Sequence, residues 1–219
     1  MRSWAITFLF LLAGLEASVA GSSKSPSGAG AAVVREMNLA RQHPEVYAGY
    51  LEELRGRYQG RNLVLPGRTM IRTREGVAAV NDAIRFLRRA RPLAPLAFSE
   101  GIARAAADHV AEQAGGGLGH RGFGRSNPGE RMNRHGIWTG RWGENISYGK
   151  STARDIVIAL IIDDGLRARK HRKNIFNPAF NVAGAAVGPH ARYRTVCSID
   201  FAGGYVEGTS ASRSLLARN

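Results

Sequence analysis

Two histidines and a carboxylate, each beside turn-forming or polar residues, are the part of this sequence best suited to chemistry. His120 follows a glycine, Glu144 lies within a Gly-Glu-Asn run, and His171 opens the run His-Arg-Lys-Asn. Neutral imidazoles and carboxylates are ligands that Zn²⁺ and similar divalent ions accept. Without a metal, the same groups could act as a general acid and base. The sequence therefore indicates either a metal site or an acid/base site.

No side chain has the context of an activated nucleophile. Ser147 and Ser151 lack the strand-turn-helix setting of a nucleophile elbow. Cys197 is the single cysteine, so an intramolecular disulfide is excluded, and its alternating, strand-like surroundings predict a buried small apolar residue. Covalent catalysis is therefore not expected, whereas a metal with an open coordination position could still activate water for hydrolysis.

The element before His120 is expected to be a helix with clear ends. Ser99 is a favourable N-cap, and three consecutive glycines, Gly115 to Gly117, should stop the helix. His120 should therefore lie at a helix end or in the following loop. His109 lies at the edge of the apolar stripe of this helix and is expected to pack there as a buried residue rather than to bind a ligand.

The element before His171 is expected to be a buried helix. Ser151 or Thr152 provides its cap, and the run from Ile156 to Ile162 is apolar nearly all round. The helix should end at Asp163-Asp164-Gly165. His171 should then lie at the ordered start of a short helix.

The remaining patterns predict further helices first and strands later. The expected helices cover residues 33–41, a stretch from Pro44, residues 75–89 and residues 126–134. Asn145–Tyr148 should form a short strand, and Val182–Val187 and Arg194–Phe201 a hairpin through Gly188-Pro189-His190. This order is typical of an α+β domain with a small antiparallel sheet.

The N-terminus has the pattern of a secretory signal peptide. Arg2 precedes an apolar run from Trp4 to Leu15, and Ser18-Val19-Ala20 is a small-x-small cleavage site. The apolar run is short for a membrane span, although an uncleaved N-terminal anchor is the alternative. We therefore expect a signal peptide over residues 1–20, a flexible lead-in over 21–32, one domain over 33–205 and a basic tail over 206–219.

The formal net charge of +14 suggests contact with anionic surfaces after export. The basic residues are mostly arginine and are scattered along the chain, without the compact run that is typical of nucleic-acid binding. Nucleic acid is therefore not an expected partner. The expected partners are lipid, an anionic envelope surface or a protein ligand.

Four motifs in order resemble the CAP superfamily, which includes cysteine-rich secretory proteins, insect venom antigens and pathogenesis-related plant proteins. They are Asn38-x-x-Arg41, Gly119-His120, Gly143-Glu144-Asn145 and His171-Arg172-Lys173-Asn174-Ile175, and the last is similar to the bacterial SCP-domain form. The resemblance covers residues 33–205. It implies an α-β-α sandwich with a small antiparallel sheet between helical layers and a cleft that holds two histidines and two acids.

The resemblance implies that His120, Glu144 and His171 are three members of this set, with Asn145 and Asn174 as supporting residues. Many family members supply the second acid from a Trp-x-x-Glu element, but this chain has Ile161-Ile162-Asp163-Asp164 and no tryptophan there. Acids at a helix C-terminus are disfavoured by the helix dipole, which favours a functional reason for their presence. The choice between Asp163 and Asp164 stays open.

The resemblance favours a binding protein over an enzyme, because family members bind lipids, metals and other proteins and do not share a catalytic activity. We expect a secreted protein that binds a ligand or a divalent metal such as Zn²⁺ through His120 and His171, with Glu144, Asp163 and Asp164 as supporting acids. One alternative is a metal-assisted, peptidase-like hydrolase that uses His120, Glu144 and His171. Another is an envelope-associated interaction protein with a vestigial cleft.

The other polar and aromatic candidates are expected to be structural. His43, His135 and His190 have no partner at an informative spacing and should lie on the surface or in turns. Trp138 and Trp142 should anchor a glycine-rich loop rather than line the cleft.

Overall fold

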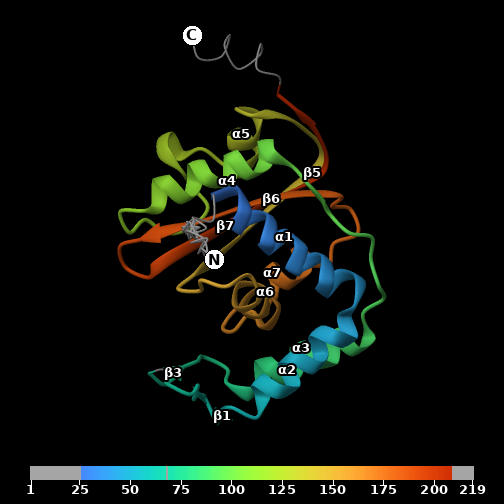
Figure 1. Cartoon of the computed structure of the whole chain (residues 1–219), viewed down its shortest axis with the longest axis vertical. Helices are drawn as coiled ribbons and strands as arrows, with labels where there is room; N and C mark the ends of the chain where they lie inside the picture. The colour runs from blue at the N-terminus through green and yellow to red at the C-terminus, as the bar shows by residue number, and fades with distance from the viewer. Residues whose placement is uncertain (1–25, 68, 209–219) are drawn as a thin grey trace, which may run out of the picture.

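Four strands form the central sheet, in the order β4-β6-β7-β5 (Figure 1). The structure, a computed structural model, describes residues 26–67 and 69–208. The short strand β4 (Ala97–Phe98) runs parallel to β6 (Val182–His190). Strand β7 (Arg194–Glu207) pairs antiparallel with β6 on one side and with β5 (Gly136–Tyr148) on the other. Strand β5 is therefore an edge strand of this sheet.

Helices cover both faces of the sheet (Figure 1). On one face lie α4 (Glu100–Gln113) and α5 (Pro128–Asn133), which pack against side chains such as Ala186 and Ala202. On the other face lie α1 (Pro26–Gln42), α6 (Ala153–Ile162) and α7 (Lys170–Ile175), over the main apolar core. The structure thus confirms the α+β class, with helical layers on either side of a mixed sheet.

Two further helices and a small β-meander complete the described chain at the lower end of Figure 1. Helices α2 (Pro44–Arg55) and α3 (Val77–Arg89) pack together and against the main core. Between them lies the meander β1 (Tyr58–Gln59), β2 (Asn62–Leu63) and β3 (Ile71–Arg72). A 3-10 turn, η1 (Phe123–Arg125), precedes α5.

Side-chain caps fix three helix starts, and the sequence predicts two of these caps, at Ser99 and at Ser151 or Thr152. Ser99 accepts a hydrogen bond from the amide of Ile102 at the start of α4. Asn127 and Glu130 form a capping box at the start of α5, and Thr152 caps α6. Each cap satisfies an amide that the first helical turn leaves without a partner, and so favours a helix start at that residue.

Asn38 and Arg41 of the first motif hold distant segments together. Asn38 exchanges two hydrogen bonds with the backbone of Leu96, just before β4. The buried Arg41 donates to four carbonyl oxygens, those of Ala94, Ile175, Asn177 and Phe180. Arg41 thereby fixes the end of α7, the helix that carries His171.

The expected flexible lead-in over residues 21–32 is wrong from residue 26 onward, because α1 already begins at Pro26. Gly30 explains the helix: a Cβ at this position would overlap the carbonyl oxygen of Ala185, so the missing side chain lets α1 approach β6. The expected signal peptide lies outside the described residues. Among the described helices, none combines the length and apolar character needed to cross a bilayer.

The domain also extends beyond residue 205, where the basic tail was expected to begin. Strand β7 continues to Glu207, whose carboxylate accepts hydrogen bonds from Ser99 Oγ and from the amide of Gly101. Glu207 thus adds an acid at the N-terminus of α4, where the helix dipole favours negative charge. The rest of the expected tail, residues 209–219, lies outside the described residues.

The expected glycine-rich loop around Trp138 and Trp142 is instead the first half of β5. The pairing of β5 with β7 shifts register between Thr139 and Trp142, and Gly140 has a positive φ of 76° there. A bulge of this kind needs glycine, which makes a strand resemble a loop in sequence.

Candidate functional site

His120 lies in the loop after α4 and reaches a buried carboxylate. Its Nδ1 lies 2.7 Å from Oε1 of Glu144. The imidazole is half exposed, with 55% of its side-chain surface accessible, whereas the Glu144 side chain retains only 1%. The buried carboxylate thereby holds the ring while its other edge faces solvent.

Glu144 is held on the other side by a buried arginine. Arg131 of α5 has no exposed surface, and its Nη2 donates to Glu144 Oε2 at 2.6 Å. The hydroxyl of Ser198 donates to the same oxygen at 3.1 Å. Arg131 Nη1 also donates to the carbonyl oxygens of His120 and Ser126. Both oxygens of Glu144 are therefore engaged, and its charge is compensated inside the protein.

His171 forms a second pair with Asp163. Its Nδ1 lies 2.8 Å from Asp163 Oδ1, and its backbone amide donates to Asp163 Oδ2 at 3.0 Å. Asp163 ends α6 with a left-handed backbone (φ 57°, ψ 45°), which turns its side chain toward α7. The Asp164 carboxylate points elsewhere and accepts from the amides of Arg74 and Glu75. Of the two acids that the sequence left open, Asp163 is the one that contacts His171.

Asn145 and Asn174 connect the two histidine–carboxylate pairs. Asn145 Nδ2 donates to the carbonyl oxygen of His171 at 3.0 Å. Asn174 Nδ2 donates to Asn145 Oδ1 at 2.9 Å and to the carbonyl oxygen of Glu144 at 3.3 Å. Because successive strand residues point to opposite faces, Glu144 faces α5 and Asn145 faces α7. His120 and His171 thus approach the edge strand β5 from opposite faces.

The imidazoles of His120 and His171 are chemically suited to be the protein ligands of a divalent metal ion. Each histidine has Nδ1 beside a carboxylate, and within the described residues no hydrogen bond engages Nε2 of either ring. A carboxylate at one ring nitrogen fixes the tautomer that leaves the other nitrogen free as a ligand. Among the described residues, however, no three His, Cys, Asp or Glu side chains are grouped to hold a metal ion.

A hollow of about 340 Å³ lies beside His120 and Glu144. We call it the β5 cleft; its other lining residues are Arg121, Asn127, Pro128 and Trp142. Trp142 also lines a neighbouring hollow of about 430 Å³ with Trp138 and Asn174. His171 lines neither hollow. Trp142 therefore lines the cleft, contrary to expectation, while Trp138 donates to the carbonyl oxygen of Gly129 as a structural anchor.

Three histidines hold the loops and helices around the site. His109 is buried as expected, and its Nε2 lies 2.9 Å from the carbonyl oxygen of Gly119, beside His120. His190 is also buried, contrary to expectation, and its Nε2 lies 2.9 Å from the carbonyl oxygen of Gly117. His135 has a partner that the sequence did not reveal, Asp108 at 2.8 Å. His43 is exposed, as expected.

Asp200 and Arg131 are the site residues that sequence reasoning missed. Asp200 lies opposite Glu144 in the β5–β7 pairing, is fully buried, and neither of its oxygens accepts a hydrogen bond from the described residues. Burial, followed by the charge of Glu144, raises the pKa of Asp200 well above its ordinary range. An aspartate inside the apolar run Val196–Ala202 was the available signal, because a buried carboxyl in a strand needs a reason.

Cys197 has the structural role that the sequence predicts. It is fully buried in the main core as a free thiol. Burial raises the pKa of the thiol, which keeps it protonated and unreactive. Ser147 is buried as well, so within the described residues neither side chain is a candidate nucleophile for the β5 cleft.

A family model described as CAP, the cysteine-rich secretory protein family, matches residues 77–201. No curated protein sequence matches the chain significantly. Three solved structures are similar, and the first, an outer surface protein from Borrelia burgdorferi, has a TM-score of 0.42 at 15% identity, covering 50% of this chain and 78% of its own.

The second similar structure is an extracellular SCP-domain protein from Bacillus anthracis, with a TM-score of 0.41 and 18% identity over 57% of this chain. The third is a cysteine-rich secretory protein from Staphylococcus aureus, with a TM-score of 0.37 and 14% identity over 58% of this chain. The match spans only 37% and 38% of these two proteins.

Proposed function

The chain belongs to the cysteine-rich secretory protein (CAP) family, and from this membership we propose that it is a secreted protein that binds a divalent metal ion such as Zn²⁺ at the edge of β5, through His120 and His171. The observation that carries the proposal is the pair of histidine–carboxylate hydrogen bonds, His120–Glu144 and His171–Asp163. Both carboxylates are buried, with 1% and 2% of their side-chain surface accessible, so both rings are held before any ligand arrives.

The Nε2 atoms of His120 and His171 would be the protein ligands of the metal. Glu144 and Asp163 would act on the metal through the imidazoles, by fixing their tautomer and orientation. When bound, the metal would act as a Lewis acid, with coordination positions open to water or an external ligand. Because the chain would provide only two ligands, we expect weaker binding than at a structural zinc site with four.

The geometry supports binding more than hydrolysis. A hydrolase would need a general base within reach of a water molecule. Glu144, the candidate for that role, has Oε1 beside His120 and Oε2 bonded to Arg131 and Ser198. A carboxylate with both oxygens engaged and its charge compensated is better suited to orienting His120 than to accepting a proton.

Export is proposed from the signal-like N-terminus, residues 1–20, together with family membership. Mass spectrometry of protein from the culture medium or envelope fraction tests this part. The expected mature N-terminus is near Gly21. A chain that retains Arg2 and stays with the membrane pellet would instead support an uncleaved anchor.

Calorimetric titration of untagged protein with ZnCl₂ tests the metal site. We expect binding that is lost in His120→Ala and in His171→Ala, because one ion needs both rings. His43→Ala is the matched control, since His43 is exposed and its carboxylate partner is Glu45, which is not part of the site. If the double variant His120→Ala/His171→Ala binds Zn²⁺ like the parent, the proposal is wrong. If each single variant loses only part of the heat, the two histidines belong to separate sites.

A further inference from the structure

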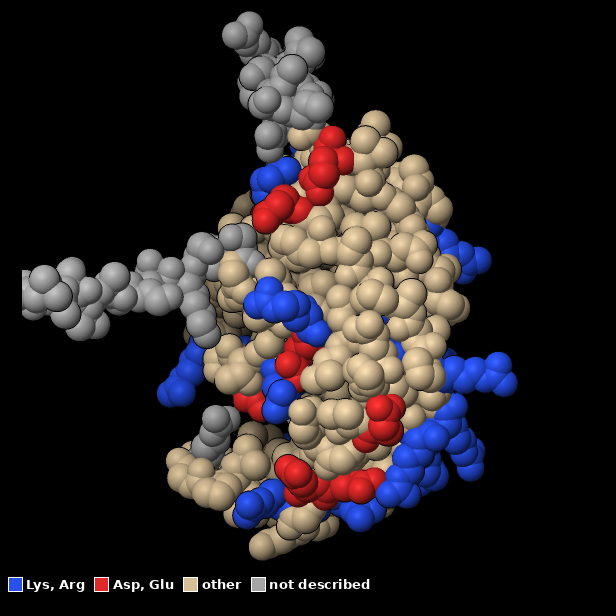
Figure 2. Space-filling view, turned by 45° about the vertical axis from the view of Figure 1, so that its right-hand side comes forward, with Lys and Arg blue, Asp and Glu red and all other residues tan. Residues whose placement is uncertain are grey.

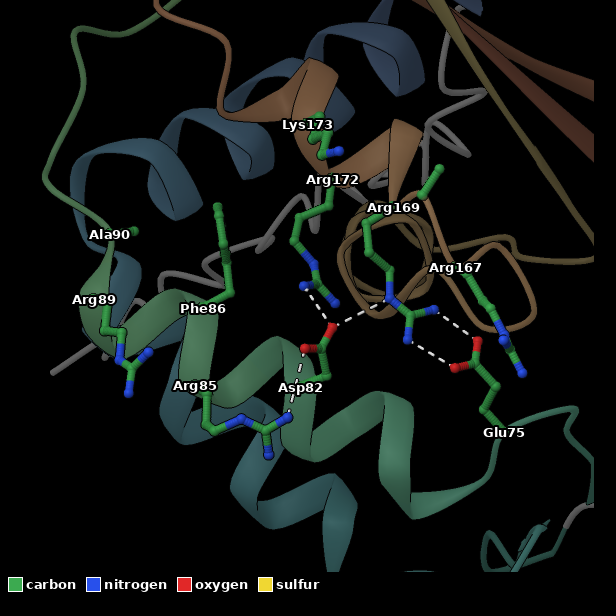
Figure 3. A pocket seen from close by; sticks show the side chains of 11 residues that line it. Glu75, Asp82, Arg85, Phe86, Arg89, Ala90, Arg167, Arg169, Arg172 and Lys173 are labelled. Carbon is green, nitrogen blue, oxygen red and sulfur yellow. Dashed lines mark hydrogen bonds and ion pairs between the residues drawn. The ribbon is translucent and has the colours of Figure 1, made fainter.

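A third hollow, of about 770 Å³, lies between α3 and the segment that leads into α7 (Figure 3). We call it the α3–α7 groove. It shares no lining residue with the β5 cleft. Six cationic side chains line it: Arg85, Arg89, Arg167, Arg169, Arg172 and Lys173. They come from two stretches some eighty residues apart, which explains why the charge looks scattered in the sequence.

The groove has a large excess of positive charge. Its six cations face two carboxylates, Glu75 and Asp82, which leaves an excess of four positive charges. In Figure 2 the blue side chains also gather most densely toward the lower end of the molecule, beside a strip of red. A concave surface with one dominant sign of charge concentrates ions of the opposite sign.

The two acids of the groove are already saturated. Glu75 accepts two hydrogen bonds from Arg169, at 2.7 and 2.8 Å, and this contact lowers the pKa of Glu75 to about 2. Asp82 lies between three guanidinium groups, with oxygen–nitrogen distances of 3.0 Å to Arg172, 3.2 Å to Arg169 and 3.5 Å to Arg85. Neither carboxylate can neutralise the remaining cations.

Two of the arginines are fixed in place without a ligand. Arg172 is buried and donates to the carbonyl oxygens of Ile161 and Ile162 as well as to Asp82. Arg169 donates to the carbonyl oxygen of Asp163 and has a left-handed backbone, with φ at 50°. A ligand that meets these guanidinium groups does not have to order them, which reduces the entropy lost on binding.

In the part of the chain that the structure describes, three cationic side chains at the rim of the groove have no close carboxylate partner. Within the described residues, no carboxylate lies within 4 Å of Arg89 or Lys173, and Arg85 is 62% exposed with only a long contact to Asp82. Figure 3 shows Arg89 and Lys173 without a dashed line to any residue drawn. These three side chains can move onto an anion while Arg169 and Arg172 form the fixed base.

We propose that the α3–α7 groove binds a multiply charged phosphate anion, either free in solution or in the head group of an anionic lipid. Guanidinium groups match phosphate oxygens with paired, charge-assisted hydrogen bonds. The excess of four charges and the volume of the groove suit an anion with several charges rather than a single monovalent ion. Phe86 and Ala90 add an apolar wall for the uncharged part of such a molecule. None of the residues that line this groove is a proposed ligand of the metal.

Calorimetric titration with sodium tripolyphosphate tests the groove. The variant Arg85→Ala/Arg89→Ala/Lys173→Ala removes three exposed or unpaired cations of the rim. The control Arg35→Ala/Arg57→Ala/Arg192→Ala removes the same charge from exposed positions elsewhere. We expect the groove variant to bind at least about 10-fold more weakly than the parent, and the control less than about 2-fold, because the lost contacts are short-range and distant charges are screened. Equal weakening in both variants would mean general charge attraction and would overturn the proposal.

Sedimentation with vesicles that contain phosphatidylinositol 4-phosphate, whose head group carries more than one negative charge, separates the two sources of phosphate. Groove-dependent binding of vesicles without binding of tripolyphosphate would assign a lipid head group, and the reverse would assign a free phosphate. If the parent binds neither probe, the proposal fails. The variant His120→Ala/His171→Ala should bind the phosphate probe like the parent, so loss of the metal site and loss of the groove are distinguishable. Matching circular dichroism melting curves would exclude unfolding as the cause.

Discussion

Glu144 and Asp200 lie directly opposite each other in the β5–β7 pairing, so that two buried carboxyl groups face one buried arginine. Arg131 donates to Glu144 and compensates its charge. Asp200 has no such partner among the described residues. Two negative charges so close together in an apolar interior are unfavourable, and the raised pKa of Asp200 indicates that it holds the proton.

Asp200→Asn should remove a pH-dependent part of the folding stability. The folded protein retains a proton on Asp200 that the unfolded chain releases near the ordinary pKa of 3.8. This contribution to stability is present below pH 3.8 and falls by up to about 1.4 kcal/mol per pH unit as the pH rises toward the folded pKa. Urea unfolding of parent and variant between about pH 5 and pH 8 measures the difference. Parallel curves would show that Asp200 is ionised in the folded protein.

Glu144→Gln should destabilise the fold by about 3 kcal/mol or more, because it leaves the charge of buried Arg131 without a partner. Chemical denaturation at neutral pH measures this change. Glu53→Gln, at an exposed position, is the control and should change stability little. An unchanged unfolding midpoint in Glu144→Gln would contradict a structural role for the Arg131–Glu144 pair.

Asp163→Asn should weaken Zn²⁺ binding about 10-fold or more, because an amide no longer fixes the ring orientation and tautomer that leave Nε2 of His171 free as a ligand. Asparagine tolerates the left-handed backbone at this position, so the helix end should survive. Asp164→Asn is the matched control, since its carboxylate contacts the amides of Arg74 and Glu75 instead. Calorimetry gives the affinities, and imidazole ¹⁵N shifts of His171 report the tautomer. Equal effects of both variants would exclude a specific role for Asp163.

Gly184→Ala should destabilise the protein by about 2 kcal/mol, because its Cβ would overlap the backbone at Ile102 and Ala103 of α4. Gly49→Ala in α2 is the control. A Cβ there meets no atom within 4 Å, so the better helix propensity of alanine should raise stability by about 0.5 to 1 kcal/mol. Thermal unfolding of the two variants gives the comparison, and a stable Gly184→Ala would mean that α4 can move away from β6.

The parts of the fold that depend on local chemistry are the ones that sequence analysis predicted. Ser99 and Thr152 cap their helices where capping rules place them, since a cap involves only the next few residues. The hairpin of β6 and β7 also follows from a local pattern. The start of α1 could not be found in this way, because Gly30 looks flexible until the contact with Ala185 is known.

The site was predictable as a set of residues but not as a set of contacts. His120 and Glu144 are paired only because the loop after α4 folds back to β5, and Arg131 enters through the packing of α5. Asp163 and Asp164 are chemically alike, and only the left-handed backbone of Asp163 decides which one faces His171. Asp200 joins the group through strand register, which no short motif contains.

Asn174, described above as a link between the two histidine pairs, has a consequence for how copies of this protein behave toward one another. The unpaired backbone groups of an edge strand can form hydrogen bonds with a strand of another molecule, and this is a common route to aggregation. Asn174 donates to the carbonyl oxygen of Glu144, and the bulge between Thr139 and Trp142 breaks the regular pairing surface further along β5. Asn174 and the bulge therefore interrupt the edge along which a strand from a second copy would add.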